Sequence, residues 1–259
     1  MDINKIKKRL ETFKEQSTLK SSFLWKPPAG KSLIRIIPYQ YDKDSQYVEL
    51  FFHFNISKGK PILSPMSYGE PDPIMEFAQK LKRSGTKEDF LLSKKLEPKQ
   101  RFFTPVIVRG SEEDGIKVWG FGITVYKELG DVVADDDYGD ISHPTKGRDI
   151  TVQLVTPAEA GNQFGKTKIV VKPNVTPLTD NPETLKTLLT TQPNISELYK
   201  KNTYEELSDM LKAYLNPEEK KETSEDGEPK SKETSKSGKA SASETPDVSA
   251  AFNELFDKE

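Results

Sequence analysis

The sequence contains no cysteine and only two histidines, His53 and His143. Without thiols, the chain can form neither a disulfide nor a thiolate metal site, and two histidines leave little for a nucleophilic triad or a zinc hydrolase. No phosphate-binding loop and no dinucleotide-binding glycine pattern is present. We therefore expect a protein that is not an enzyme and that needs neither a cofactor nor a metal.

Long apolar runs are also missing. Hydrophobic residues make up 34% of the 259 residues and charged residues 31%, and no run approaches the roughly 20 apolar residues that span a bilayer. The first residues, MDINKIKKRLETF, lack the continuous apolar segment of a signal peptide. These features predict a soluble intracellular protein with no membrane partner.

The net charge of -2 conceals a segregation of charge along the chain. Residues 1–110 contain 21 Lys and Arg against 12 Asp and Glu, a net charge of +9, whereas residues 111–259 contain 18 against 29, a net charge of -11. A basic half indicates a site for a polyanion, and an acidic tail could compete for that site. Chance segregation over a solvated surface is the alternative.

Alternating and β-branched residues predict about six strands in the middle of the chain. They fall at residues 32–39, 47–57, 101–110, 115–129, 149–157 and 167–175, and short turn-rich segments join the third to the fourth and the fifth to the sixth as antiparallel hairpins. Capping residues predict helices over 72–85 and 86–96, from Asn181-Pro182, and over 203–215. We expect a mainly β protein with appended helices (α+β), built on an OB-fold five-stranded barrel.

Four regions follow from this pattern. Residues 1–20 form a basic amphipathic arm, and residues 21–215 form the core. Residues 216–246, rich in Lys, Glu, Ser and Thr, read as a disordered linker. Residues 247–259 form an acidic tip whose sparse apolar residues predict a partner-docking peptide; those residues are Phe252, Leu255 and Phe256.

The predicted strand at 47–57 carries aromatic residues on both faces. Val48, Leu50 and Phe52 alternate as a buried face should, yet Tyr47, Phe51 and His53 alternate on the other face, which a merely solvated strand seldom shows. Single-strand binding without sequence choice needs aromatic faces for bases and a basic groove for the backbone. We interpret the second face as the border of a cleft in which bases stack.

Lysine or arginine recurs beside aromatic residues in four separate segments, and Arg35 lies within an apolar strand, where a charge without an anionic partner is costly. The alternative for Arg35 is an internal carboxylate partner. Trp119 and Phe121 could instead be core residues that do not contact DNA. One of Phe102 and Phe103 should also point into the core. The candidate DNA-binding residues are Arg35, Phe51, His53, Lys58, Lys60, Tyr68, Lys94, Lys95, Lys99, Arg101, Phe102, Phe103, Trp119, Phe121, Phe164, Lys166 and Lys168.

In its order of segments the chain resembles the single-stranded DNA-binding, helix-destabilising proteins of T4-like bacteriophages. The resemblance rests on a basic arm, LWKPPAGKSLIRIIP, FFTPVIV, KVWGFG, an aromatic-lysine loop, a linker and an acidic tip. It implies an OB-fold core and an arm that binds a neighbouring copy, in which Lys7, Lys8 and Arg9 serve cooperative binding. It also implies a tail that contacts replication and recombination proteins, and Arg35 in the DNA cleft.

The chain differs from the T4 member of this family at the zinc site, which in that member uses three cysteines and one histidine. Here DPIM stands where the last two ligands would be, so that Asp72 and Met75 occupy their places. We expect a metal-free helical subdomain held by apolar packing of Ile62, Met66, Ile74, Met75 and Phe77.

Together these features predict sequence-independent, cooperative binding of single-stranded DNA in phage replication, recombination and repair, in the cytoplasm of an infected bacterial host. Two alternatives stay open. One is an OB-fold RNA-binding regulator. The other is a metal-dependent nuclease or phosphatase that uses the carboxylates between Asp131 and Asp140, although an acidic solvent loop is the plainer interpretation of that cluster.

Overall fold

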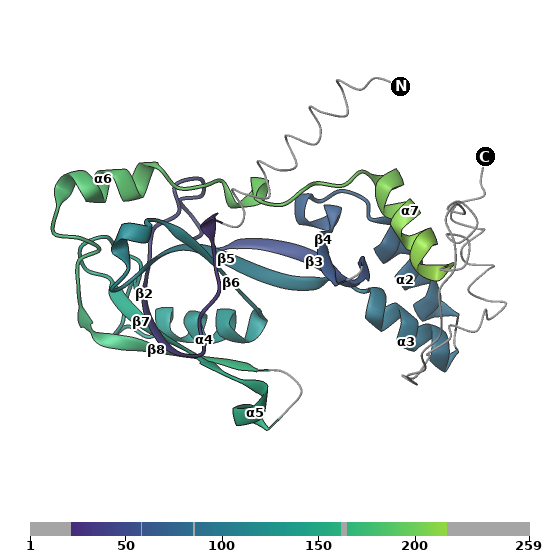
Figure 1. Cartoon of the computed structure of the whole chain (residues 1–259), viewed down its shortest axis with the longest axis horizontal. Helices are drawn as coiled ribbons and strands as arrows, with labels where there is room; N and C mark the ends of the chain where they lie inside the picture. Colours follow the sequence, from purple (N-terminus) through teal and green to yellow (C-terminus); the bar gives the residue numbers. More distant parts are fainter. Residues whose placement is uncertain (1–21, 58, 85, 162–164, 217–259) are drawn as a thin grey trace, which may run out of the picture. The chain divides into compact units, whose positions relative to one another are not determined.

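A computed structural model describes residues 22–57, 59–84, 86–161 and 165–216 (Figure 1). Within it the chain divides into two compact units. The sheet unit comprises the described residues up to Leu50 and those from Gln100 to Lys200, and the helical unit comprises Phe51–Lys99 and the residues from Lys201 onward. The predicted arm, almost the whole linker, and the acidic tip lie outside the described residues, as do Lys58 and Phe164.

The sheet unit contains strands in the order β1-β6-β5-β2-β7-β8, and every pair in this path is antiparallel except β1 with β6. Its elements are β1 (Leu24–Trp25), β2 (Gly30–Ile36), β5 (Lys99–Val108), β6 (Lys117–Phe121), α4 (Ile123–Val133), β7 (Arg148–Val155), α5 (Pro157–Ala160), β8 (Lys166–Val175) and α6 (Pro182–Thr190). In the described residues β1 and β8 end this path and do not pair with each other. The sheet is therefore open in the described residues, which is consistent with the expected α+β class, but the closed OB barrel expected from the sequence is not confirmed.

Both hairpins predicted from the sequence are present, since β5 pairs with β6 and β7 pairs with β8. The prediction was wrong for residues 123–129, which were assigned to the strand of β6 but begin the helix α4. Ile123, Thr124, Val125 and Tyr126 favour strands by propensity. The helix forms nonetheless because it buries Val125 and Leu129 against Ile150, Val152 and other residues of one sheet face.

The opposite sheet face is covered at β5. Ile107 packs there with Ile37 and Leu178, and leucines of α6 lie against them. Because β5 is buried on both faces, the alternation of its residues does not separate a core side from an outer side.

The helical unit is built around three helices and a two-stranded ladder. Its elements are the part of β3 (Val48–Ser57) from Phe51 onward, β4 (Lys60–Leu63), α2 (Pro73–Arg83), α3 (Lys87–Leu96) and α7 (Tyr204–Leu215). Asp72, Thr86 and Thr203 cap the three helices as the sequence predicts. The apolar stripe of α2, which includes Ile74, Phe77 and Leu81, packs with leucines of α3 and α7.

No helix in the ranges that the structure describes is long and apolar enough to cross a membrane.

Candidate nucleic-acid interface

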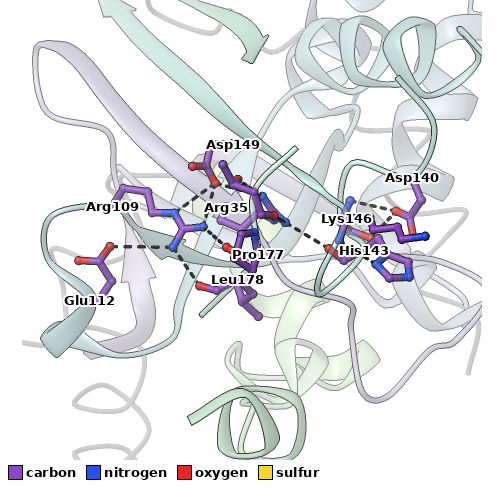
Figure 2. Close-up of polar contacts among 11 residues, drawn as sticks. Arg35, Arg109, Glu112, Asp140, His143, Lys146, Asp149, Pro177 and Leu178 are labelled. Atoms are coloured by element: carbon purple, nitrogen blue, oxygen red, sulfur yellow. Dashed lines mark hydrogen bonds and ion pairs between the residues drawn. The ribbon is translucent and has the colours of Figure 1, made fainter. Parts of the chain in front are cut away.

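Arg35 lies in the interior of the sheet unit, not on a surface that DNA could reach. Its side chain is 0% exposed and contacts the carboxylate of Asp149 at 3.1 Å. The guanidinium also donates to the hydroxyl of Thr176 at 2.9 Å and to the carbonyl oxygen of His143 at 3.1 Å (Figure 2). The alternative weighed from the sequence, an internal carboxylate partner, is therefore what the structure shows, and the expected position of Arg35 in an open cleft is wrong.

Asp149 is shared between two arginines. Arg109, the residue after β5, approaches the same carboxylate oxygen through Nε at 3.1 Å and Nη2 at 3.0 Å, and it also donates to the carbonyl oxygens of Pro177 and Leu178 (Figure 2). Burial lowers the pKa of Arg35, and the charge of Asp149 opposes that shift. This network joins β2, β7 and the residue after β5 to residues 176–178, so its role is to hold the sheet unit together.

The aromatic candidates on β5 and β6 are core residues. Trp119 is 1% exposed and packs in the same cluster as Phe102 and Phe121. Phe103 is buried on the other face, and a side chain at Gly120 would meet its ring at 2.7 Å, so glycine is needed for the ring to lie there. The sequence left open which of Phe102 and Phe103 faces inward, and the structure buries both.

His53 is also buried, contrary to the expected outward face. It is 1% exposed. Its Nδ1 donates to the carbonyl oxygen of Leu96 at 2.7 Å, and its Nε2 lies 2.9 Å from the carboxylate of Asp72. Tyr47 packs edge-on against Phe121 and Tyr126. Of the three residues expected to border a stacking cleft, Tyr47 and Phe51 are partly exposed and His53 is buried.

Asp72 lies at the centre of a hydrogen-bonded cluster within the helical unit. Besides His53, its carboxylate accepts from the hydroxyl of Ser64 and from the backbone N–H groups of Ile74 at 2.9 Å and Met75 at 3.2 Å. Burial alone would raise the pKa of Asp72, but the hydrogen bond and charge of His53 and the other donors lower it below its ordinary value. The cluster joins β3, the residue after β4, the start of α2 and the end of α3.

This cluster lies where the resemblance would place the last zinc ligands. Among the residues that the structure describes, no three His, Cys, Asp or Glu side chains gather to hold a metal ion, and this includes the stretch from Asp131 to Asp140. Ile62, Ile74 and Phe77 are buried as expected, but Met66 is 37% exposed and Met75 is only partly buried. Apolar packing therefore stabilises part of the subdomain. The hydrogen bonds of the His53–Asp72 cluster, which the sequence did not predict, stabilise it as well.

Basic side chains line an exposed region of the sheet. The strand registers place Lys31 of β2, Gln153 of β7 and Lys168 of β8 in one row across three strands. Lys166 lies two residues before Lys168 and so projects from the same face. Lys31, Lys166 and Lys168 are all exposed, and Val170, in the next row, is 61% exposed. We call this group the lysine row.

Lys31 was not among the candidates, although its position in the strand pattern could have indicated it. It precedes Leu33 and Arg35 at a spacing of two, so it lies on their strand face, at the end where the strand leaves the core. Another residue absent from the candidates is Tyr41, which at 54% is the most exposed aromatic side chain among the described residues.

The remaining candidates have mixed surroundings. Lys60, Lys95 and Lys99 are exposed, whereas Lys94 pairs with Glu97 at 2.9 Å. Tyr68 is 37% exposed and has the ammonium of Lys201 4.9 Å from its ring centre. Arg101, in the sheet unit, is exposed. The candidates outside the described residues are Lys7, Lys8, Arg9, Lys58, Phe164, Phe252, Leu255 and Phe256.

The exposed ammonium groups of the lysine row are suited to neutralise phosphates. A sequence model described as "gp32 DNA binding protein like" matches residues 28–216, and the chain belongs to that family. The family resemblance drawn from the sequence is thereby confirmed. No curated protein matches the chain significantly.

Proposed function

We propose that this protein coats single-stranded DNA cooperatively and without sequence choice, acting by binding alone. Membership of the DNA-binding family over residues 28–216 is the observation that carries the proposal. The lysine row supports it, because ammonium groups without a fixed hydrogen-bonding geometry neutralise phosphates of any sequence. Arg35 and the buried aromatics have no direct part in this proposal, since they lie in the core.

The lysine row can be tested through the salt dependence of binding. Each phosphate neutralised on a single strand contributes a slope of about -0.7 to log K against log salt. Lys31→Ala with Lys168→Ala should therefore weaken binding to a short oligo-dT and make that slope shallower by about 0.7 for each lost contact. Fluorescence titration of a labelled oligo-dT at several salt concentrations measures both effects.

Lys127→Ala is the matched control, because Lys127 is exposed on α4, which covers the other sheet face. We expect this variant to keep the wild-type slope. An unchanged slope in the double variant would remove the lysine row from the interface. Tighter binding to poly-U than to poly-dT would favour the RNA-binding alternative.

We further infer a place for the protein in phage DNA replication, recombination and repair, within the cytoplasm of an infected bacterium. The arm, through Lys7, Lys8 and Arg9, would bind the neighbouring copy on the strand. The acidic tip would dock replication and recombination proteins through Phe252, Leu255 and Phe256. What supports these roles is the charge segregation of the sequence and the family to which the chain belongs.

Deleting residues 217–259 should raise the affinity for single strands at low salt, because the acidic tip is expected to compete with DNA for the basic surface. The difference between the truncated and the full chain should shrink as salt rises, since exposed charges are screened within about 10 Å at 0.1 M salt. Oligo-dT titrations of both chains at low and high salt measure this. Equal affinities at low salt would contradict the competition.

A further inference from the structure

The helix α4 carries apolar side chains on a surface that its own unit does not cover. Its buried face uses Val125 and Leu129, yet Ile123 is 41% exposed, Tyr126 37% and Val133 44%. Together with Gly130 these residues follow positions i, i+3, i+7 and i+10, which place them on one side of a helix. We call these four residues the α4 stripe.

Gly130 has no internal reason to be a glycine. No heavy atom lies within 4 Å of the place where its Cβ would be, and its φ is not in the left-handed region. Glycine inside a helix is destabilising relative to alanine, and its common use is to let another backbone approach closely. An open glycine between two exposed apolar residues therefore indicates a surface on which another segment lies.

Contacts with two other aromatic rings fix the position of the Tyr126 ring on this surface. Its ring stacks on Phe102 with centroids 3.9 Å apart and meets Tyr47 edge-on at 5.5 Å. A fixed, partly exposed aromatic ring loses little conformational freedom on binding and is a frequent centre of binding energy in interfaces.

Exposed carboxylates outnumber exposed ammonium groups near the stripe, where Lys127 is the basic residue on α4. Asp131 lies in the last turn of α4, and the residues that follow the helix add three more exposed carboxylates, Asp135, Asp136 and Asp137. A basic segment with a matching apolar stripe would complement this surface.

Residues 1–20 of the sequence have both properties. Ile3, Ile6, Leu10 and Phe13 repeat the same i, i+3, i+7, i+10 spacing, and the basic residues Lys5, Lys7, Lys8 and Arg9 lie among them. We propose that the α4 stripe with its acidic flank is the docking surface for the N-terminal arm of a neighbouring copy. This inference rests on the proposed self-association along DNA and identifies the surface that carries it.

The described chain begins at the end of β6 that lies away from α4. Lys117, the first residue of β6, donates to the carbonyl oxygen of Ser22, and β1 runs parallel to β6. Ser22, the first described residue, therefore lies at the start of β6, whereas α4 begins beyond the end of that strand. An arm that binds the α4 of the next copy makes a head-to-tail contact, which repeats without closing and so suits a linear strand.

The test is Gly130→Gln in the full chain, with Thr124→Gln, on an exposed flank of the same helix, as the matched control. Binding is measured on an oligo-dT with room for one protein and on long poly-dT. Gly130→Gln should fold with an unchanged or higher melting temperature and keep its affinity for the short oligonucleotide. Its cooperativity on poly-dT should fall about tenfold or more, as for loss of a central interface contact. Thr124→Gln should match the wild type on both.

A mixture decides between neighbouring and same-chain docking. Leu10→Asp damages the arm but leaves α4 intact, and Gly130→Gln does the reverse. On an oligo-dT with room for two proteins, the equimolar mixture should bind more cooperatively than either variant alone. No recovery in the mixture would overturn docking between copies.

Three outcomes, two on the wild type and one on Gly130→Gln, separate this inference from the proposed function. Wild-type protein that fails to bind the short oligo-dT would refute single-strand binding itself. Wild-type protein that binds the short oligonucleotide but shows no cooperativity on poly-dT would refute self-association only. Wild-type cooperativity in Gly130→Gln would refute the α4 stripe as the docking surface while leaving DNA binding intact.

Discussion

Replacing Asp149 by leucine should lower the free energy of unfolding of the sheet unit by about 3–5 kcal/mol, the usual cost of leaving a buried charge without its partner. Arg35 is fully buried, and its side chain cannot reach water when the carboxylate is removed. Arg109, at 18% side-chain exposure, can turn toward solvent or toward Glu112, which lies 4.0 Å away. The penalty therefore arises mainly from Arg35.

Tryptophan fluorescence during urea unfolding measures the effect, because the two tryptophans, Trp25 and Trp119, both lie in the sheet unit. The double variant Arg35→Met, Asp149→Leu should recover much of the loss, since replacing both partners of a buried pair by apolar residues is often neutral or stabilising. Asp136→Ala, at an exposed carboxylate, is the control and should change stability by less than about 0.5 kcal/mol. A double variant as unstable as the sum of its two single variants would show that the two charges are not coupled.

The sequence predicted those parts of the fold that depend on neighbours along the chain. Asp72, Thr86, Asn181 and Thr203 each cap the helix expected after them. Each cap is a side-chain oxygen that accepts from an N–H group two or three residues ahead, so the signal is local. The hairpins of β5 with β6 and of β7 with β8 were found for the same reason.

Such local signals cannot predict contacts between residues that are far apart in the sequence. Arg35 and Asp149 are 114 residues apart, and no local pattern says that an arginine in a strand will meet that carboxylate instead of a phosphate. The order of the strands and the open edge of the sheet are likewise set by long-range pairing. Because the sheet is open in the described residues, the closed barrel expected from the sequence is not confirmed.

The aromatic residues were misplaced for a related reason. Alternation identifies an outer face only where one face of a strand is solvated. β5 and β6 are covered on both faces, so Phe102, Phe103, Trp119 and Phe121 are all buried. The residues that stayed accessible, such as those of the lysine row, lie where strands leave this core.

A second large effect is expected in the helical unit, where Asp72 is both a helix cap and the partner of His53. Asp72→Ala removes the acceptor of two backbone N–H groups, the Ser64 hydroxyl and the His53 ring. We expect a loss of about 3–5 kcal/mol, as for a broken buried pair. Thr86→Ala, which removes the cap of α3 alone, is the matched control and should cost about 1 kcal/mol.

Asp72→Asn tests what the charge of Asp72 contributes to stability apart from capping, because asparagine caps helices about as well as aspartate. The folded-state pKa of Asp72 is lowered, so its charge stabilises the unit above the unfolded-state value of about 3.9 and this contribution is lost as pH falls through the folded-state pKa. The stability difference between the wild type and Asp72→Asn should therefore be largest near neutral pH and shrink below about pH 4.

Hydrogen exchange of the amides in residues 73–96, corrected for the intrinsic rate at each pH, measures this difference without interference from the sheet unit. A difference that stays constant from pH 7 to pH 3 would show that the charge of Asp72 does not stabilise the fold. In the same assay at pH 7, EDTA should leave the wild-type protection unchanged, because the hydrogen bonds of the His53–Asp72 cluster hold β3, Ser64, α2 and α3 together. A loss of protection with EDTA would instead mean that a bound metal helps to hold these helices, as chelation destabilises a unit that depends on its metal.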